Sequence, residues 1–90
     1  MLTWSTEELA EILDVAASTV RKWIQKKQLR AVKACNKEGN RIRESSLIDF
    51  LDDHPKYRQI FLHKLTNNGA IGNKDSKEVY NYLLQKGYLT

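Results

Sequence analysis

Basic side chains are concentrated in one part of the sequence. Residues 21–43 hold nine Lys and Arg residues against one acid, Glu38, whereas residues 1–20 hold four acids and no base. Residues 44–55 again carry a net charge of −4. A basic segment between two acidic ones is typical of a surface that faces the phosphates of a nucleic acid. An ordinary solvated lysine-rich face has the same composition, so charge alone leaves both interpretations open.

Two side chains of this segment can read base edges. Arg binds guanine and Gln binds adenine through paired hydrogen bonds in the major groove, and a spacing of four residues places Arg21 and Gln25 on one face of a helix. We expect the DNA-binding set on this helix to be Ser18, Thr19, Arg21, Lys22, Gln25 and Lys26. A phosphate contact without base reading is the alternative for Arg21 and Lys22, and Thr19 can serve only to start the helix.

Four further cations flank a turn. The segment 36–40 has the sequence Asn-Lys-Glu-Gly-Asn, which is typical of a turn, and the residues on both sides alternate in polarity as strands do. We expect a two-stranded hairpin whose basic rim touches phosphates or the minor groove through Lys33, Lys37, Arg41 and Arg43. The alternative is a solvated loop.

The sequence offers no pattern for catalysis, a cofactor or a metal. Cys35 is the single cysteine, His54 and His63 are isolated, and neither a nucleophile–base pair nor a phosphate-binding glycine loop is present. No apolar run approaches the length of a membrane span, and the N-terminus lacks the features of a signal peptide. We therefore expect a cytoplasmic protein that is not an enzyme and has no membrane partner.

The first helix that must position these residues has a clear start. Ser5 and Glu8 have the spacing of a capping box, and Trp4 and Leu9 have that of a hydrophobic staple. This predicts a helix that begins after Ser5 and stops at residues 14–16.

A second helix is predicted from Ala17 or Ser18 to Lys26. Its inner side is apolar, and we expect Trp23 to pack in the core: the inner residues are Val20, Trp23 and Ile24. Two short helices joined by a short turn, the second with a basic outer face, form a helix-turn-helix. An ordinary helical hairpin is the alternative.

The rest of the chain is predicted to be mainly helical. A helix over 44–53, capped by Ser45 or Ser46, ends before Pro55. A helix over 57–65, a glycine-containing loop to Lys74 and a helix over 76–86 follow. The predicted fold is mainly α with a small β-hairpin: a winged helix-turn-helix over residues 1–55, followed by two C-terminal helices over 56–90 that serve packing or oligomerisation.

The order of these features resembles the excisionase-like branch of the MerR superfamily. The resemblance covers residues 2–53 and rests on the sequences 9–24, 29–32, 41–43 and 47–51. It implies that the second helix enters a major groove and that the hairpin, or wing, touches the adjacent backbone or minor groove. Ala16 and Lys27 depart from the family, which commonly has Ser or Thr and Gly at these places. Ser18 offers a different cap, for a helix that starts two residues later.

Sequence-preferring binding of double-stranded DNA is the leading hypothesis. By the resemblance, the chain would be a small accessory or regulatory protein of a mobile element or phage: an excision directionality factor, a small repressor or a packaging-site binder. Partners would then include a second copy on DNA and an integrase or other protein. The alternative is a protein-interaction module that binds a host or phage protein through the C-terminal helices, with an aromatic surface formed by Tyr57, Phe61, Tyr80, Tyr82 and Tyr88. Core packing or homodimerisation explains these aromatic residues equally well.

Overall fold

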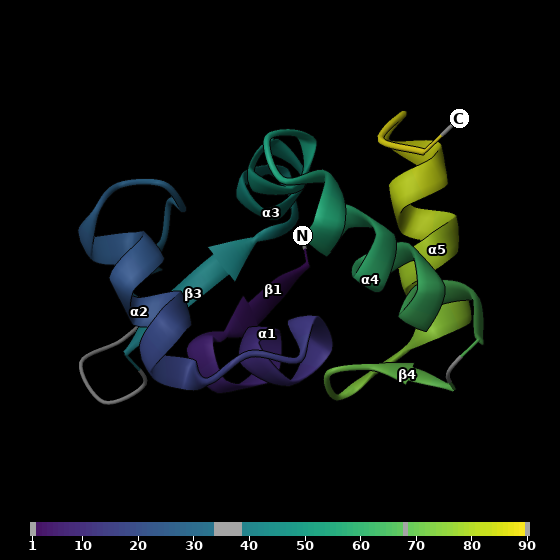
Figure 1. The fold of residues 1–90 in the computed structure, drawn as a ribbon. Helices are drawn as coiled ribbons and strands as arrows, with labels where there is room; N and C mark the ends of the chain where they lie inside the picture. Colours follow the sequence, from purple (N-terminus) through teal and green to yellow (C-terminus); the bar gives the residue numbers. More distant parts are fainter. Residues whose placement is uncertain (1, 34–38, 68, 90) are drawn as a thin grey trace.

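The computed structural model describes residues 2–33, 39–67 and 69–89. A small antiparallel sheet lies at the centre of the first half of the chain (Figure 1). The strands are β1 (Thr3–Ser5), β2 (Val32–Lys33) and β3 (Asn40–Arg43), in the order β1-β3-β2. The predicted hairpin is β2–β3, and the predicted fold class is confirmed. Sequence analysis missed β1, which pairs Trp4 with Ile42 on β3.

Helix α1 (Thr6–Leu13) starts as predicted. The Glu8 backbone N–H donates to the Ser5 hydroxyl at 3.1 Å, and the Ser5 N–H donates to the Glu8 carboxylate at 2.8 Å. These two bonds satisfy donors that the first turn of a helix leaves without partners. Trp4 and Leu9, the residues of the predicted staple, are fully buried.

The turn after α1 is fixed by local bonds and by a contact from the second half of the chain. Asp14 adopts a left-handed backbone with φ 58°, and the Val15 N–H donates to Ala10 O at 3.0 Å, the pattern of a Schellman motif. The Lys64 ammonium donates to Glu11 O at 2.8 Å and pairs with the Asp14 carboxylate. The predicted stop at residues 14–16 is therefore confirmed.

Helices α2 (Ala17–Gln25) and α3 (Glu44–Asp52) follow the turn and the hairpin. The predicted cap of α3 by Ser45 or Ser46 is wrong. Arg43 is the last residue of β3 and also precedes the first turn of α3, and its side chain makes no capping bond. Because the strand passes directly into the helix, both serines fall within the first turn.

The second half consists of α4 (Pro55–Asn67), a hairpin and α5 (Ser76–Gln85). Pro55 occupies the first turn of α4, where its missing N–H costs no helical bond. A loop was expected before α5, but the chain there forms an antiparallel pair of strands, β4 (Ala70–Ile71) and β5 (Lys74–Asp75). Gly87 follows α5 with φ 81°, as predicted for the residue after its end.

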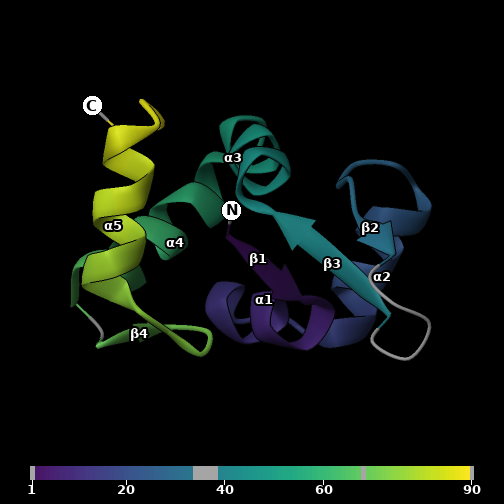
Figure 2. The same cartoon turned by 180° about the vertical axis from the view of Figure 1, so that it is seen from behind.

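One hydrophobic core runs through both halves. It includes Leu13 of α1, Leu47 of α3, Phe61 of α4 and Leu83 of α5, and α4 lies between the first half and α5 in both views (Figures 1 and 2). The Trp4 indole N–H donates to Ile71 O of β4 at 3.4 Å. Residues at opposite ends of the sequence thus share a single core.

A polar contact joins α3 to α5. Glu44 is buried, and one carboxylate oxygen accepts a hydrogen bond from the Tyr82 hydroxyl at 3.1 Å. Burial, followed by the hydrogen bond to Glu44 and its negative charge, raises the pKa of Tyr82. Within the part of the chain that the structure describes, the other Glu44 oxygen has no hydrogen-bond partner.

The contact between Gly72 and Trp4 generates a prediction about stability. Gly72 has φ 63°, and a Cβ there would lie 3.0 Å from Trp4 Cδ1, whose side chain is fully buried and cannot move aside. Gly87 has φ 81° but open space around it. Both alanine variants incur the left-handed penalty of about 1 to 2 kcal/mol, and Gly72→Ala adds a steric cost. In chemical denaturation Gly72→Ala should therefore lose clearly more stability than the control Gly87→Ala. Equal losses would contradict this packing.

Candidate nucleic-acid interface

The outer face of α2 carries most of the predicted DNA-binding residues. Ser18, Arg21, Lys22 and Gln25 are exposed, and Thr19 is half-buried. The spacing of residues 18, 21, 22 and 25 places them on one face of the helix. On the other side, Val20 is fully buried and Ile24 packs against the core. The structure thus brings this part of the predicted set together on one polar surface.

Trp23 packs against the core on the inner side of α2, as predicted. Its ring centroid lies 4.6 Å from that of Phe50 on α3 and 5.1 Å from that of Tyr57 on α4. Contacts to two other helices fix the rotation of α2 about its axis, and therefore the direction in which Arg21 and Gln25 point.

The structure shows at which residue α2 starts. The helix begins at Ala17, and Ala16, at the cap position, has no side chain to bond the first amides. The alternative cap by Ser18 is wrong, because Ser18 lies inside the first turn. The Thr19 N–H donates to Ala16 O at 3.0 Å, and Ala16 offers the first two amides of the helix no side-chain partner. The start of the helix is a position that favours negative charge.

A residue in a strained conformation follows the end of α2. Lys27, where the resembling family commonly has glycine, has a left-handed backbone with φ 62°. The Gln28 N–H donates to Trp23 O at 2.9 Å, and the Lys27 N–H donates to Ile24 O at 3.1 Å. These bonds close a Schellman motif around a residue that has a side chain. Lys26, predicted to contact DNA, is exposed at the last turn.

Arg21 has a neighbour of opposite charge. Its guanidinium forms an ion pair with Glu7 of α1 at 3.1 Å, and both side chains are more than half exposed. Such a pair contributes little stability and exchanges readily with solvent. Arg21 can therefore leave Glu7 for a ligand at small cost, although Glu7 competes with any anionic ligand for it.

The four hairpin cations lie in different surroundings. Lys33 of β2 and Arg43 of β3 are exposed, whereas Lys37 lies outside the described residues, as does Cys35. Arg41 turns toward β1: its guanidinium donates to the Thr3 hydroxyl at 3.0 Å and lies 3.6 Å from the Glu8 carboxylate. A phosphate contact by Arg41 would have to replace these partners.

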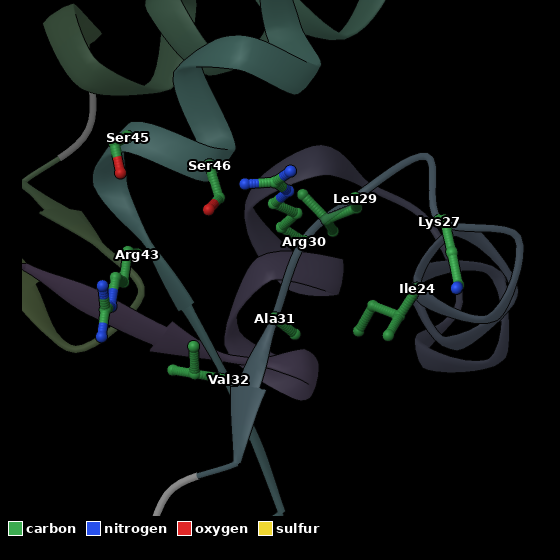
Figure 3. A pocket seen from close by; sticks show the side chains of 9 residues that line it. All are labelled: Ile24, Lys27, Leu29, Arg30, Ala31, Val32, Arg43, Ser45 and Ser46. Carbon is green, nitrogen blue, oxygen red and sulfur yellow. The ribbon is translucent and has the colours of Figure 1, made fainter.

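A basic groove joins the end of α2 to the start of α3. It has a volume of about 570 Å³ and is lined by Ile24, Lys27, Leu29, Arg30, Ala31, Val32, Arg43, Ser45 and Ser46 (Figure 3). The Arg30 side chain extends toward Ser46 in this view, and Lys27 and Arg43 lie on opposite sides of them. From the sequence, Arg30 was only one of the nine cations of residues 21–43, and the two serines were expected only as caps.

The aromatic residues of the alternative hypothesis are mainly packing residues. Phe61 is buried, while Tyr57, Tyr82 and Tyr88 are half-buried against the core. Tyr80 is the member of this set that is exposed, at 39%. Leu84, one turn further along α5, is also exposed.

In the described ranges 2–33, 39–67 and 69–89, no group of three or more His, Cys, Asp or Glu side chains is arranged to hold a metal ion. No helix in these ranges is both long and apolar enough to cross a membrane.

The chain matches a known protein family. Residues 5–55, more than half of the chain, match the family model described as a helix-turn-helix domain. The match includes α1, α2, the β2–β3 hairpin and α3. Searches among curated proteins and among solved structures return no match.

The left-handed residue at the end of α2 generates a prediction about stability. Lys27→Gly should raise the free energy of unfolding by about 1 kcal/mol, because glycine adopts this backbone without a Cβ penalty. Lys26→Gly is the matched control: its φ of −83° suits any residue, so glycine there should lower stability by up to about 1 kcal/mol. Chemical denaturation of both variants measures the difference. If Lys27→Gly is no more stable than Lys26→Gly, α2 does not end as described.

Proposed function

Since the chain belongs to the helix-turn-helix domain family, we propose that it binds double-stranded DNA with sequence preference through the exposed face of α2. The observation that carries this proposal is the two-sided character of that helix. Val20, Trp23 and Ile24 pack inward, while Arg21, Lys22 and Gln25 are presented together to solvent. A helix of nine residues is about 13 Å long and fits within a major groove.

In this mode the residues of α2 divide into two roles. Gln25 and Arg21 lie where they can bond adenine and guanine edges, whereas Lys22 and Lys26 neutralise phosphates. Ser18 and Thr19, at the uncapped start of the helix, bond a phosphate that approaches its free amides. The β2–β3 hairpin acts as a wing, and Lys33, Lys37 and Arg43 supply its phosphate or minor-groove contacts. Arg41 joins them only by leaving Thr3 and Glu8.

The biological role follows from the resemblance to excisionase-like proteins of the MerR superfamily. We propose a small accessory or regulatory protein of a mobile element or phage, in excision, repression or recognition of a packaging site. One nine-residue helix reads few base pairs, so we expect two or more copies on repeated or inverted sites. An integrase or another DNA-bound protein is a further partner in the excision role.

Protein interaction through α4 and α5 is the second candidate. Tyr80 and Leu84, both exposed, favour it, since aromatic and apolar side chains are frequent in interfaces. The burial of Phe61 and the packing of Tyr57, Tyr82 and Tyr88 speak against a large aromatic contact surface. DNA binding therefore has the stronger support.

Charge removal on α2 tests the proposal directly. Arg21→Ala/Lys22→Ala should weaken duplex binding by tenfold or more, on the order expected for two lost contacts, and lower the salt slope by about 0.9 through the loss of the Lys22 phosphate contact. Arg58→Ala/Lys77→Ala removes the same two kinds of charge from α4 and α5 and should leave binding nearly unchanged. Fluorescence anisotropy at two or more salt concentrations measures both. The proposal fails if the wild-type protein binds no duplex at low salt or if the two double variants behave alike.

Glu7 provides a test in the opposite direction. Glu7→Gln releases Arg21 and removes a negative charge beside the DNA surface, so duplex affinity should rise about two- to threefold at low salt. Glu78→Gln, an exposed acid in the first turn of α5, is the matched control. A gain of equal size in both variants would show that only net charge matters and would refute a specific effect on Arg21.

A further inference from the structure

The groove of Figure 3 contains three cations from three segments of the chain. Lys27 comes from the end of α2, Arg30 from the connection to β2, and Arg43 from the end of β3. None of the described residues that line the groove is acidic. Three positive charges gathered by the fold around one hollow create a potential that attracts an anion.

The side chains of these three cations are exposed. Among the described residues, Lys27, Arg30 and Arg43 take part in no ion pair and no side-chain hydrogen bond. By contrast, Arg41, Arg58 and Lys64 each have a carboxylate partner. The cations of the groove are thus available to a ligand.

Polar donors complete the wall of the groove opposite Lys27. The hydroxyls of Ser45 and Ser46 line it, and both residues belong to the first turn of α3, which has no side-chain cap. Guanidinium groups, hydroxyls and backbone amides at a helix start are the groups that bind a phosphate oxygen.

Acidic residues lie near the groove but are not among the residues that line it. Asp49 and Asp53 line an adjoining hollow together with Arg30 and Ser46. Neither lies within 4 Å of the Arg30 guanidinium, since no such ion pair occurs in the described part of the chain. Glu44, also in the first turn of α3, is buried and bonded to Tyr82. The site therefore suits an anion that Arg30 and Arg43 can bind from solvent.

We infer that this groove binds a backbone phosphate of the DNA, held mainly by Arg30 and Arg43 with the Ser45 and Ser46 hydroxyls. The inference rests on the proposed function and extends it, because the groove begins at Lys27, directly after α2, and leads away from the base-reading face. The phosphate contact fixes how the duplex lies across the hairpin and α3. It contributes affinity for any sequence and no preference among sequences.

Duplex binding measured against salt is the first test. Each phosphate contact contributes about 0.9 to the salt slope, so one contact accounts for about a 3.5-fold loss of affinity between about 50 and 200 mM salt. In Arg30→Gln, the loss of duplex affinity between these two salt concentrations should be about 3.5-fold smaller than in the wild-type protein. The substitution should weaken binding to preferred and to random duplexes by the same factor. Ser46→Ala should weaken binding by a smaller, equally uniform factor. Arg58→Gln, a matched loss of charge on α4, should change neither quantity.

A titration with inorganic phosphate tests the groove without DNA. In ¹H–¹⁵N NMR spectra, phosphate should shift the Ser45 and Ser46 amide signals and the Arg30 side-chain N–H signal, and Arg30→Gln should abolish the amide shifts. Sodium chloride at the same ionic strength should leave these signals in place. Circular dichroism of each variant verifies that it is folded.

The outcomes separate the groove from the proposed function. If the wild-type protein binds duplex DNA but Arg30→Gln keeps the wild-type salt dependence, the groove inference is overturned and the function of α2 stands. If phosphate shifts the groove signals but no duplex binds, the anion site stands, and its assignment to DNA fails together with the proposed function. If neither ligand binds, both are overturned.

Discussion

Burial of Trp4 is the interaction on which the rest of the structure depends. The residue lies on β1, pairs with Ile42 of β3, and directly precedes the capped start of α1. Its indole N–H reaches Ile71, and its ring lies over Gly72, so it ties the first strand to the hairpin between α4 and α5. Removal of a tryptophan of this size from water contributes roughly 5 kcal/mol as an upper estimate.

The candidate DNA-binding helix depends on this core because it has little stability of its own. Helix α2 is nine residues long, has no side-chain cap, and ends at a strained lysine. Isolated helices of this length are unstable in water, so tertiary packing must hold α2 in place. Trp23, against Phe50 and Tyr57, provides that packing and sets the orientation of the opposite face. Residues of the core therefore control how Arg21 and Gln25 are presented to solvent.

Residues 56–89 contribute to the same arrangement. Lys64 of α4 bonds the turn between α1 and α2, and Tyr57 of α4 contacts Trp23. These contacts reach both the start and the inner side of the candidate recognition helix. We therefore expect changes in α4 to alter DNA binding indirectly, through the position of α2.

Local signals allowed the sequence to predict most helices. The capping box of Ser5 and Glu8 and the glycine after α5, Gly87, each depend only on residues a few positions away. The structure has both features where they were expected. The strand β1 and the β4–β5 hairpin were missed because strands of two or three residues carry no measurable periodicity. Their pairing partners are set by the tertiary fold.

The candidate site was predictable only in part, for a related reason. The outer face of α2 follows from helical spacing alone. The contact of Arg41 with Thr3 depends on β1, which the sequence did not indicate, and the grouping of Arg30, Arg43 and Ser46 joins segments that lie apart in the sequence. The composition gives the number of these cations but not the surface on which they lie.

We propose that the exposed face of α2 contacts the bases of a duplex while its inner face remains in the core. The most direct measurement is a ¹H–¹⁵N NMR titration with a duplex selected from a random pool. We expect the largest changes at the signals of Ser18, Arg21, Lys22 and Gln25, with those of α5 almost unchanged. Changes centred on Tyr80 and Leu84, with α2 unaffected, would contradict it.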